Sequence, residues 1–336
     1  RDAARRAEPH DMPLPARIVD CHHHFLAPSE PFHAFLKTLG APAYSAEQYA
    51  ADSGALPIAK TVHVEAMADD GAAEAAHVDA LARGSDACKV AAIVANCNLA
   101  APDAEEQLVK IKAASALVRG IRCILDYDGP FDGVCPTHIA CRDHDTDYLR
   151  DPIASPAFER GYRLLAKYQL SFDLQCCPAQ MEAAAALISR HAEVPVVVDH
   201  MGKPWKLAAD GGPDDAAKLA RWRAGMATLA ALPNVSCKLS MLGCALPGWL
   251  ADAAKEAVLR DLVLETIGLF GAGRCMFNSN WHINGAVSNS DQGDVPGDEA
   301  LTMTLLFERF SSWTSHLSED ERNMLFAGSA ERFYRI

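Results

Sequence analysis

The chain has 336 residues, of which 50% are hydrophobic and 22% are charged. This composition supplies a sizeable core and excludes a disordered protein. The net charge is −13 and no run of Lys or Arg stands out, which argues against nucleic acid or an anionic membrane as a partner. No apolar stretch approaches the roughly 18 residues that a membrane helix needs.

Eleven cysteines raise the question of disulfides. Several of them, including Cys21, Cys176 and Cys237, fall in apolar runs, where cysteine behaves as a small hydrophobic side chain in a reducing compartment. The first residues include arginines and acids but no apolar core, so they are not typical of a signal peptide. We therefore expect a cytoplasmic protein, with residues 1–16 as an N-terminal extension.

Short apolar runs alternate along the chain with longer stretches at helical spacing. The runs predict strands over residues 17–21, 61–65, 89–95, 118–125, 170–176, 194–199, 234–239 and 274–278. The Ala-rich stretches between them predict helices over residues 72–83, 104–117, 156–168, 179–191, 214–231 and 251–270. Residues 126–152 and 279–298 form long connections after the fourth and the eighth predicted strand.

Strands that are apolar on both faces belong to a sheet covered on both sides, which is typical of parallel pairing. Eight such strands alternating with helices predict a single-domain (β/α)8 TIM barrel over residues 17–336. An open doubly wound sheet is the alternative. It would call for a glycine-rich loop after the first strand, and this chain has histidines there. Both long connections then lie on the C-terminal face, where loops carry function.

The first predicted strand ends in the run Ile-Val-Asp-Cys-His-His-His-Phe. Side chains alternate along a strand, which predicts that Asp20, His22 and His24 share one face. Two imidazoles on one face can converge on one ion, with Asp20 beneath them as a supporting partner. A histidine-rich turn without any ligand is the alternative.

Other predicted strands also end in polar residues. His200 follows a nearly apolar strand, as a metal ligand or as a core histidine bonded to backbone. Arg122 is suited either to clamp a substrate carboxylate or to form a salt bridge with Glu65. Lys203 and Lys238 are candidates to polarise an oxyanion, or else they bind strand-end carbonyls. In a barrel enzyme, such strand ends supply the chemistry.

A second pattern lies in the long connection after the fourth strand. Cys135, His138, Cys141 and His144 recur at every third residue, and alternating thiolates and imidazoles can hold a structural zinc. Zinc sites usually pair their ligands into two separated halves, so this even spacing argues against one.

Together these stretches resemble the amidohydrolase superfamily, in its amidohydrolase-related branch of sugar-lactone, muconolactone and pyrone-dicarboxylate lactonases. Besides the histidine run, the matching stretches are Val-His-Val-Glu-Ala, Val-Arg-Gly-Ile-Arg, Leu-Ser-Phe-Asp-Leu-Gln, Val-Val-Asp-His-Met-Gly-Lys-Pro, Asn-Val-Ser-Cys-Lys-Leu-Ser and Gly-Ser-Ala-Glu-Arg-Phe-Tyr-Arg-Ile. The resemblance runs from about residue 18 to the end. It implies a barrel with a mononuclear metal site, or a metal-free relic of one, at the C-terminal face.

Carried over residue by residue, the resemblance makes His22, His24 and His200 metal ligands. It places His200, Asn280 and Lys203 in the catalytic machinery. It places Arg122, Gln175, Lys203 and Lys238 in the substrate pocket, and we expect Glu65, Trp205, Trp281 and His282 to contact the substrate as well. The metal is then zinc or manganese. Gln175 stands where metal-rich relatives place histidine, which indicates that the ion is held weakly or is absent.

The last predicted strand departs from much of the family, whose usual pattern there is Gly-Ser-Asp-Trp-Pro with the Asp as general base. This chain has Asn280 at that point, in Asn-Ser-Asn-Trp-His. An amide cannot accept a proton at neutral pH. Either a metal lowers the pKa of its own water, or His282, Glu65 or Asp291 serves as the base, or hydrolysis has been lost.

The resemblance therefore implies a hydrolase that opens the ring ester of a sugar lactone or of a carboxylated aromatic-pathway lactone. One alternative is metal-dependent, non-oxidative decarboxylation of an aromatic or muconate-type acid. The other is a catalytically impaired barrel that only binds a ligand, which the asparagine at position 280 keeps open. The expected partner is a small-molecule substrate, and the barrel is expected to pair as a homodimer.

Overall fold

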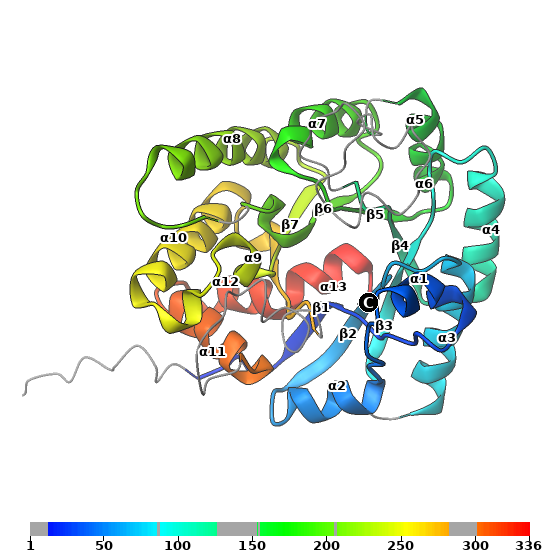
Figure 1. Cartoon of the computed structure of the whole chain (residues 1–336), viewed down its shortest axis with the longest axis horizontal. Helices are drawn as coiled ribbons and strands as arrows, with labels where there is room; N and C mark the ends of the chain where they lie inside the picture. The colour runs from blue at the N-terminus through cyan, green and yellow to red at the C-terminus, as the bar shows by residue number, and fades with distance from the viewer. Residues whose placement is uncertain (1–12, 86–87, 126–152, 154, 205–206, 282–300) are drawn as a thin grey trace, which may run out of the picture.

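The computed structural model describes residues 13–85, 88–125, 153, 155–204, 207–281 and 301–336. Its strands form one 8-stranded parallel sheet in chain order, from β1 next to β2 through to β8 (Figure 1). The strands are β1 Ile18–His23, β2 Ile58–Val64, β3 Val90–Asn96, β4 Val118–Arg122, β5 Ser171–Leu174, β6 Val196–Val198, β7 Val235–Leu239 and β8 Cys275–Phe277. Every predicted strand is present, with bounds that differ by a few residues.

The ring closes between β1 and the segment that follows β8. His23 and Trp281 form a parallel bridge. The amide of Asn280 donates to the carbonyl of His22 at 2.8 Å, and the amide of His24 donates to the carbonyl of Trp281 at 2.7 Å. The predicted (β/α)8 barrel is therefore confirmed, and the open sheet is excluded.

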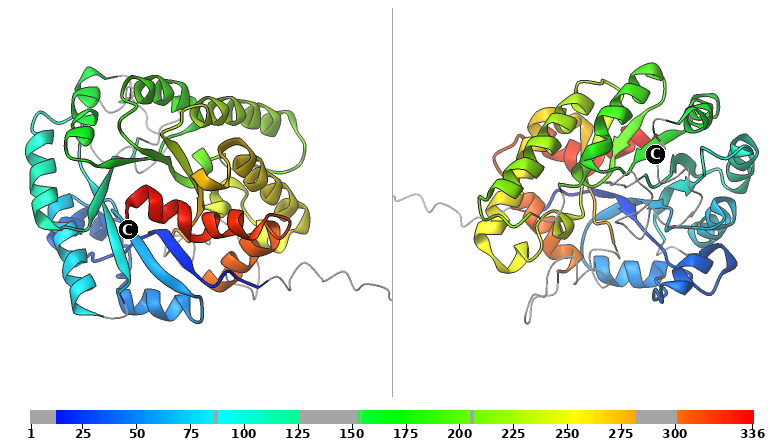
Figure 2. Two further views of the ribbon diagram at one scale, coloured as in Figure 1. Left: turned by 180° about the vertical axis from the view of Figure 1, so that it is seen from behind. Right: turned by 45° about the horizontal axis from the view of Figure 1, so that its top comes forward.

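Helices surround the ring of strands (Figures 1 and 2). They are α1 Ala34–Thr38, α2 Ala46–Ser53, α3 Gly71–Gly84, α4 Ala104–Ala114, α5 Pro156–Tyr162, α6 Leu164–Lys167, α7 Met181–Arg190, α8 Pro213–Ala230, α9 Leu242–Ala245, α10 Ala253–Phe270, α11 Met303–Trp313, α12 Glu319–Asn323 and α13 Ser329–Tyr334. The stretch predicted as one helix over 156–168 is two, α5 and α6. No helix in the described ranges combines the length and the apolar character that a bilayer crossing requires.

The last helix, α13, closes the amino end of the barrel, and the sequence analysis did not predict it. It lies across the middle of the ring in Figure 2. Ala330 and Tyr334 pack with Val19 and Val62 of the barrel interior. Glu331 accepts hydrogen bonds from Arg17 at 2.6 Å and from Lys60 at 3.1 Å, near the starts of β1 and β2. Helix α13 is thus part of the barrel core.

A β-bulge in β1 changes the predicted facing of the histidine run. From Asp20 to His23 β1 advances three residues, while β2 advances two, from Thr61 to His63. Cys21 therefore packs in the barrel interior, His22 also faces inward, and Asp20 turns outward. The prediction that Asp20 lies beneath His22 and His24 is wrong, because it assumed unbroken alternation.

Outside the barrel, Asp20 joins β1 to the segment after β8. One carboxylate oxygen accepts from the Ser279 amide at 2.8 Å. The other accepts from the Ser279 hydroxyl at 2.5 Å and from the Tyr49 hydroxyl at 2.7 Å. Asp20 is fully buried. It holds the segment that carries Asn280, so its structural role lies in closing the ring.

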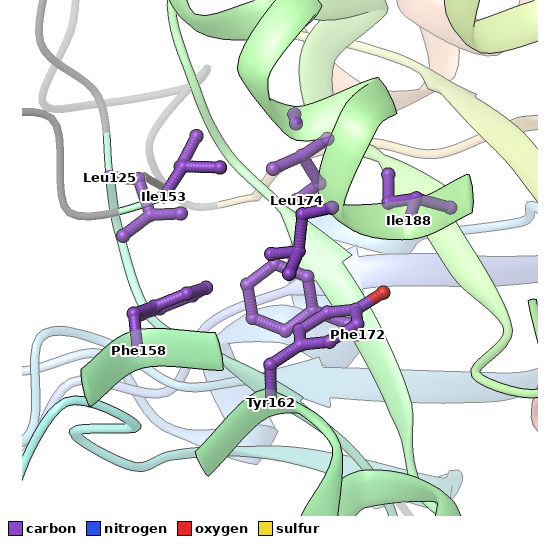
Figure 3. Close-up of a pocket in the computed structure, with 9 residues that line it drawn as sticks. Leu125, Ile153, Phe158, Tyr162, Phe172, Leu174 and Ile188 are labelled. Atoms are coloured by element: carbon purple, nitrogen blue, oxygen red, sulfur yellow. The ribbon is translucent and has the colours of Figure 1, made fainter. Parts of the chain in front are cut away.

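A small cavity lies between α5, α7 and β5, and it does not have the character of a binding site (Figure 3). Its volume is ≈ 10 Å³, about the room for one water molecule. Its lining is apolar: Leu125, Ile153, Phe158, Tyr162, Phe172, Leu174, Ala184, Leu187 and Ile188. Such a space is a packing defect of the outer core.

The loops after β1 and β2 are fastened together by Glu74 of α3. Its Oε1 accepts from the Ala66 amide at 2.9 Å, from His33 Nε2 at 3.1 Å and from His63 Nε2 at 3.3 Å. A backbone amide of the loop after β1 donates to Nδ1 of each histidine, so the proton of each neutral ring is on Nε2. Burial favours the neutral acid, but these histidine hydrogen bonds hold the pKa of Glu74 below its ordinary value.

We predict that Glu74→Gln lowers the free energy of unfolding by about 1–2 kcal/mol at pH 7, because a charged acceptor bonds more strongly than a neutral one. A carboxylate with a lowered folded-state pKa stabilises above its unfolded pKa of about 4.3, and the effect fades as pH falls through the folded-state value. Urea unfolding of both proteins should therefore show the gap narrowing from pH 5 to pH 3. A gap independent of pH would contradict this assignment.

Candidate functional site

Polar side chains from most of the strands meet at the carboxyl end of the barrel. The ring centroid of His22 on β1 lies 4.8 Å from that of His200 after β6, and 5.0 Å from that of His24. His22 therefore lies against both of the other imidazoles, although His22 and His200 are 178 positions apart in the chain. Each of them is buried.

The backbone at these strand ends is strained. After β6, His200, Met201 and Lys203 have φ of 56°, 53° and 52°, and after β8, Asn280 has φ of 50°. Residues other than glycine pay about 1–3 kcal/mol for such a conformation, and it persists only where surrounding structure imposes it. This clustering at the carboxyl ends of strands is typical of a functional site.

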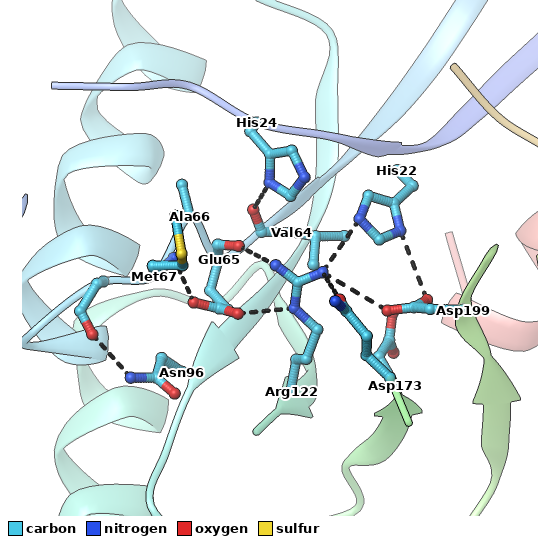
Figure 4. Close-up of polar contacts among 12 residues, drawn as sticks. His22, His24, Val64, Glu65, Ala66, Met67, Asn96, Arg122, Asp173 and Asp199 are labelled. Carbon is cyan, nitrogen blue, oxygen red and sulfur yellow. Dashed lines mark hydrogen bonds and ion pairs between the residues drawn. The ribbon is translucent and has the colours of Figure 1, made fainter. Parts of the chain in front are cut away.

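Arg122 of β4 is fully engaged with protein groups (Figure 4). Its Nε donates to Glu65 Oε1 at 2.7 Å, and Nη2 donates to the Glu65 carbonyl at 2.5 Å. Its Nη1 donates to Gln175 Oε1 at 3.0 Å and lies 3.3 Å from His22 Nε2. Of the two roles left open by the sequence, the structure contains the salt bridge with Glu65.

Lys238 of β7 lies below the histidines with no exposed surface. Its Nζ is 2.5 Å from Asp173 Oδ2, 3.1 Å from Asp199 Oδ1 and 3.1 Å from His22 Nδ1. The contacts with Asp173 and His22 are hydrogen bonds, and the contact with Asp199 is an ion pair. The substrate contact predicted for Lys238 does not fit this position, because the charge is committed to the protein itself.

His22, Asp199 and His200 form a cluster that could hold a metal ion. One ligand atom from each lies within 4.8 Å of the others. Within the described part of the chain neither oxygen of Asp199 has a hydrogen-bond partner, although both face cations, Lys238 at 3.1 Å and Arg122 at 3.6 Å. Two imidazoles and a carboxylate suit zinc. The donor set thus fits an ion, with Asp199 in the place where His24 was predicted.

The charge states of this cluster follow from its burial. Burial lowers the pKa of His200 to about 3, so its ring is neutral at physiological pH. Burial and the Lys238 charge lower the pKa of His22 as well. Burial alone would raise the pKa of Asp199. The neighbouring Lys238 and His22 have the larger, opposite effect and hold the pKa of Asp199 well below its usual range. Neutral imidazoles beside a carboxylate are the protonation states that bind metal ions.

His24 and Asn280 form a separate pair. His24 Nδ1 is 2.8 Å from the Val64 carbonyl, which can only accept, so Nδ1 carries the proton. Burial and the Arg122 charge lower the pKa of His24, so Nε2 bears a lone pair. Nε2 is 3.2 Å from Oδ1 of Asn280. Two acceptors cannot hydrogen-bond to each other, so we assign the Asn280 amide in the flipped orientation, with its nitrogen toward Nε2 and its oxygen turned away from His24.

The remaining predicted residues are distributed around this centre. Gln175 contacts Arg122 as described, and the amide of Lys203 donates to the His200 carbonyl at 2.9 Å. Trp281 is buried in the seam of the ring, where its indole donates to Asp52 Oδ2 at 2.8 Å. The other predicted site residues lie outside the described residues: Trp205, His282, Asp291 and the Cys/His pattern at 135–144.

The sequence analysis missed Asp173, Asp199 and Tyr334 as members of this network. Asp173 and Lys238 are charged residues inside apolar strands. A buried charge needs a partner of opposite charge, so the presence of one was a signal for the other. Asp199 directly precedes His200 and shares its strand end. Tyr334 had no such local signal, because its position depends on the docking of α13.

The amidohydrolase family model, Amidohydro_2, matches residues 19–336. The chain is 32% identical to an uncharacterised protein, y4mH, of Sinorhizobium fredii, over 56% of each protein, so this match spans just over half of that relative. It is 28% identical to L-fucono-1,5-lactonase of Burkholderia ambifaria over 74% of this chain and 71% of that protein. An amidohydrolase structure from Burkholderia multivorans with bound zinc has a TM-score of 0.71 at 24% identity, covering 95% and 99% of the two chains.

We predict strong coupling between Arg122 and Glu65. Arg122→Met should lower the free energy of unfolding by about 3–5 kcal/mol, because it leaves a buried carboxylate without its cation. Glu65→Gln removes that charge, so the double variant should lose at least about 1 kcal/mol less than the sum of the single variants. Urea unfolding of the four proteins gives the coupling energy. Additive losses would show that the pair is not energetically coupled.

Proposed function

The chain belongs to the amidohydrolase family, and we propose that it hydrolyses the ring ester of a lactone. The observation that carries this proposal is the convergence of His22, Asp199 and His200 at the carboxyl end of the barrel, beside the amide of Asn280. The relatives named as L-fucono-1,5-lactonases support it. Hydrolysis of such an ester needs an oriented water molecule and a stabilised oxyanion.

His22, Asp199 and His200 would hold a divalent ion, zinc in the first instance. When bound, such an ion lowers the pKa of water towards 7 and polarises a carbonyl. Lys238 and Arg122 stand next to the same ligands, and their positive charges oppose a further cation. We therefore expect weaker retention of the ion than at a site without these two side chains.

Asn280 orients the nucleophile in this proposal. With the amide of Asn280 in the flipped orientation assigned above, its carbonyl oxygen is directed away from His24 and can accept a hydrogen bond from water. Asn280 takes no proton. The ammonium of Lys203, whose charge acts on His200, would stabilise the negative oxygen that develops on the lactone carbonyl.

The pairing of the two buried cations with protein carboxylates favours an uncharged, hydroxyl-bearing sugar lactone over a carboxylated one. Arg122 is paired with Glu65 and lies near Asp199, and Lys238 is paired with Asp173 and Asp199. These two cations face three carboxylates, so neither offers surplus charge to a substrate carboxylate.

We predict that the protein hydrolyses sugar 1,5-lactones at least tenfold faster, in kcat/KM, than 2-pyrone-4,6-dicarboxylate. A pH-indicator assay over a panel of lactones measures both values of kcat/KM.

His22→Ala should lower kcat/KM at least 100-fold with the far-UV spectrum unchanged. The matched control is His191→Ala, at a partly exposed histidine that pairs with Glu159. Full activity of His22→Ala would remove His22 from the mechanism.

Asn280→Asp separates the hydrolase from its alternatives. If the protein is a hydrolase, the parent should be active, and the activity of Asn280→Asp should be within about tenfold of the parent's. Activity that appears only in the variant would favour a barrel that binds ligand without turnover. Metal analysis, with assays for release of CO2 from aromatic acids, tests decarboxylation: one tightly held zinc or manganese per chain together with CO2 release would favour that reaction instead.

A further inference from the structure

We propose that Tyr334, the third residue from the end of the chain, is a positioning residue for the site at the opposite end of the barrel. Through Asp173 its hydroxyl fixes the Lys238 ammonium, and through Lys238 it fixes His22 and Asp199. The link to catalysis rests on the proposed lactone hydrolysis. The positioning itself rests on contacts among buried side chains.

The contacts form a continuous chain. The Tyr334 hydroxyl donates to Asp173 Oδ2 at 2.8 Å, and the same oxygen accepts from Lys238 Nζ at 2.5 Å. That ammonium is also 5.5 Å from the centroid of the Tyr334 ring, a cation–π distance. From there Nζ reaches His22 and Asp199, each at 3.1 Å. All five side chains are fully or almost fully buried.

Asp173 depends on Tyr334 for its orientation. Its other oxygen, Oδ1, has no hydrogen-bond partner within the described part of the chain. Both bonds to Oδ2 therefore define where the carboxylate points. Removal of the tyrosine hydroxyl leaves Asp173 held by Lys238 alone, so the pair is free to shift together.

Lys238 transmits this shift to the site. A lysine side chain is a flexible stem of four carbons with a point charge at its end, so its position is set by its partners. When Asp173 moves, Lys238 Nζ moves with it, away from His22 Nδ1 and toward Asp199. The imidazole of His22 then loses its close contact with the ammonium at Nδ1, while Arg122 still faces Nε2. Site geometry thus depends on a hydroxyl from the last helix.

The test is Tyr334→Phe, which keeps the ring in the core and deletes only the hydroxyl. We expect kcat on the best sugar lactone to fall about tenfold with KM within about twofold, because substrate contacts are untouched. Tyr162→Phe is the matched control, since Tyr162 is also fully buried and its hydroxyl has no hydrogen-bond partner among the described residues. It should leave kcat and KM unchanged. Equal kinetics in both variants would overturn the proposal.

A second measurement does not depend on turnover. The ¹⁵N chemical shifts of His22, assigned by loss of its signals in His22→Ala, report which ring nitrogen carries the proton and what bonds each makes. We expect them to change in Tyr334→Phe and to stay constant in Tyr162→Phe. Unchanged shifts would refute the positioning role. A changed shift in a protein without lactonase activity would instead uphold the positioning and refute the proposed function.

Discussion

The carboxyl half of the barrel depends on the interactions of the buried Lys238 ammonium. A charge without exposure to water is strongly destabilising unless good partners surround it. Here the partners are Asp173 of β5, Asp199 directly after β6 and His22 of β1. Replacing any one of them leaves the buried charge with fewer partners. The amino half of the interior, by contrast, is filled by apolar side chains such as Val19 and Val62.

A second constraint is the closure of the ring. Parallel barrels need their first and last strands to meet, and β8 has three residues. Most of the seam is formed after the strand ends, by backbone bonds to Asn280 and Trp281 and by the outward carboxylate of Asp20. The same seam sets the left-handed conformation of Asn280. Barrel closure and site geometry therefore share the same residues.

The two ends of the barrel are connected through its interior. At the amino end α13 packs among the strands, and at the carboxyl end the histidines converge. Asp173 and Lys238 lie between them and contact both. Because a packed barrel interior has little free space, a group inserted at one end influences side chains at the other. This makes α13 part of the functional architecture.

The sequence by itself determined the eight strands, their parallel order and the meeting of His22 with His200, because hydrophobic periodicity is local and strand ends in a closed barrel share one face. Only the tertiary structure decided which atoms face one another. The bulge that turns Asp20 outward is set by pairing with β2, and the strained turn at His200 is held by its surroundings. The contact of Tyr334 with Asp173 joins residues 161 positions apart. Such contacts arise from packing between distant segments, which no local pattern of residues encodes.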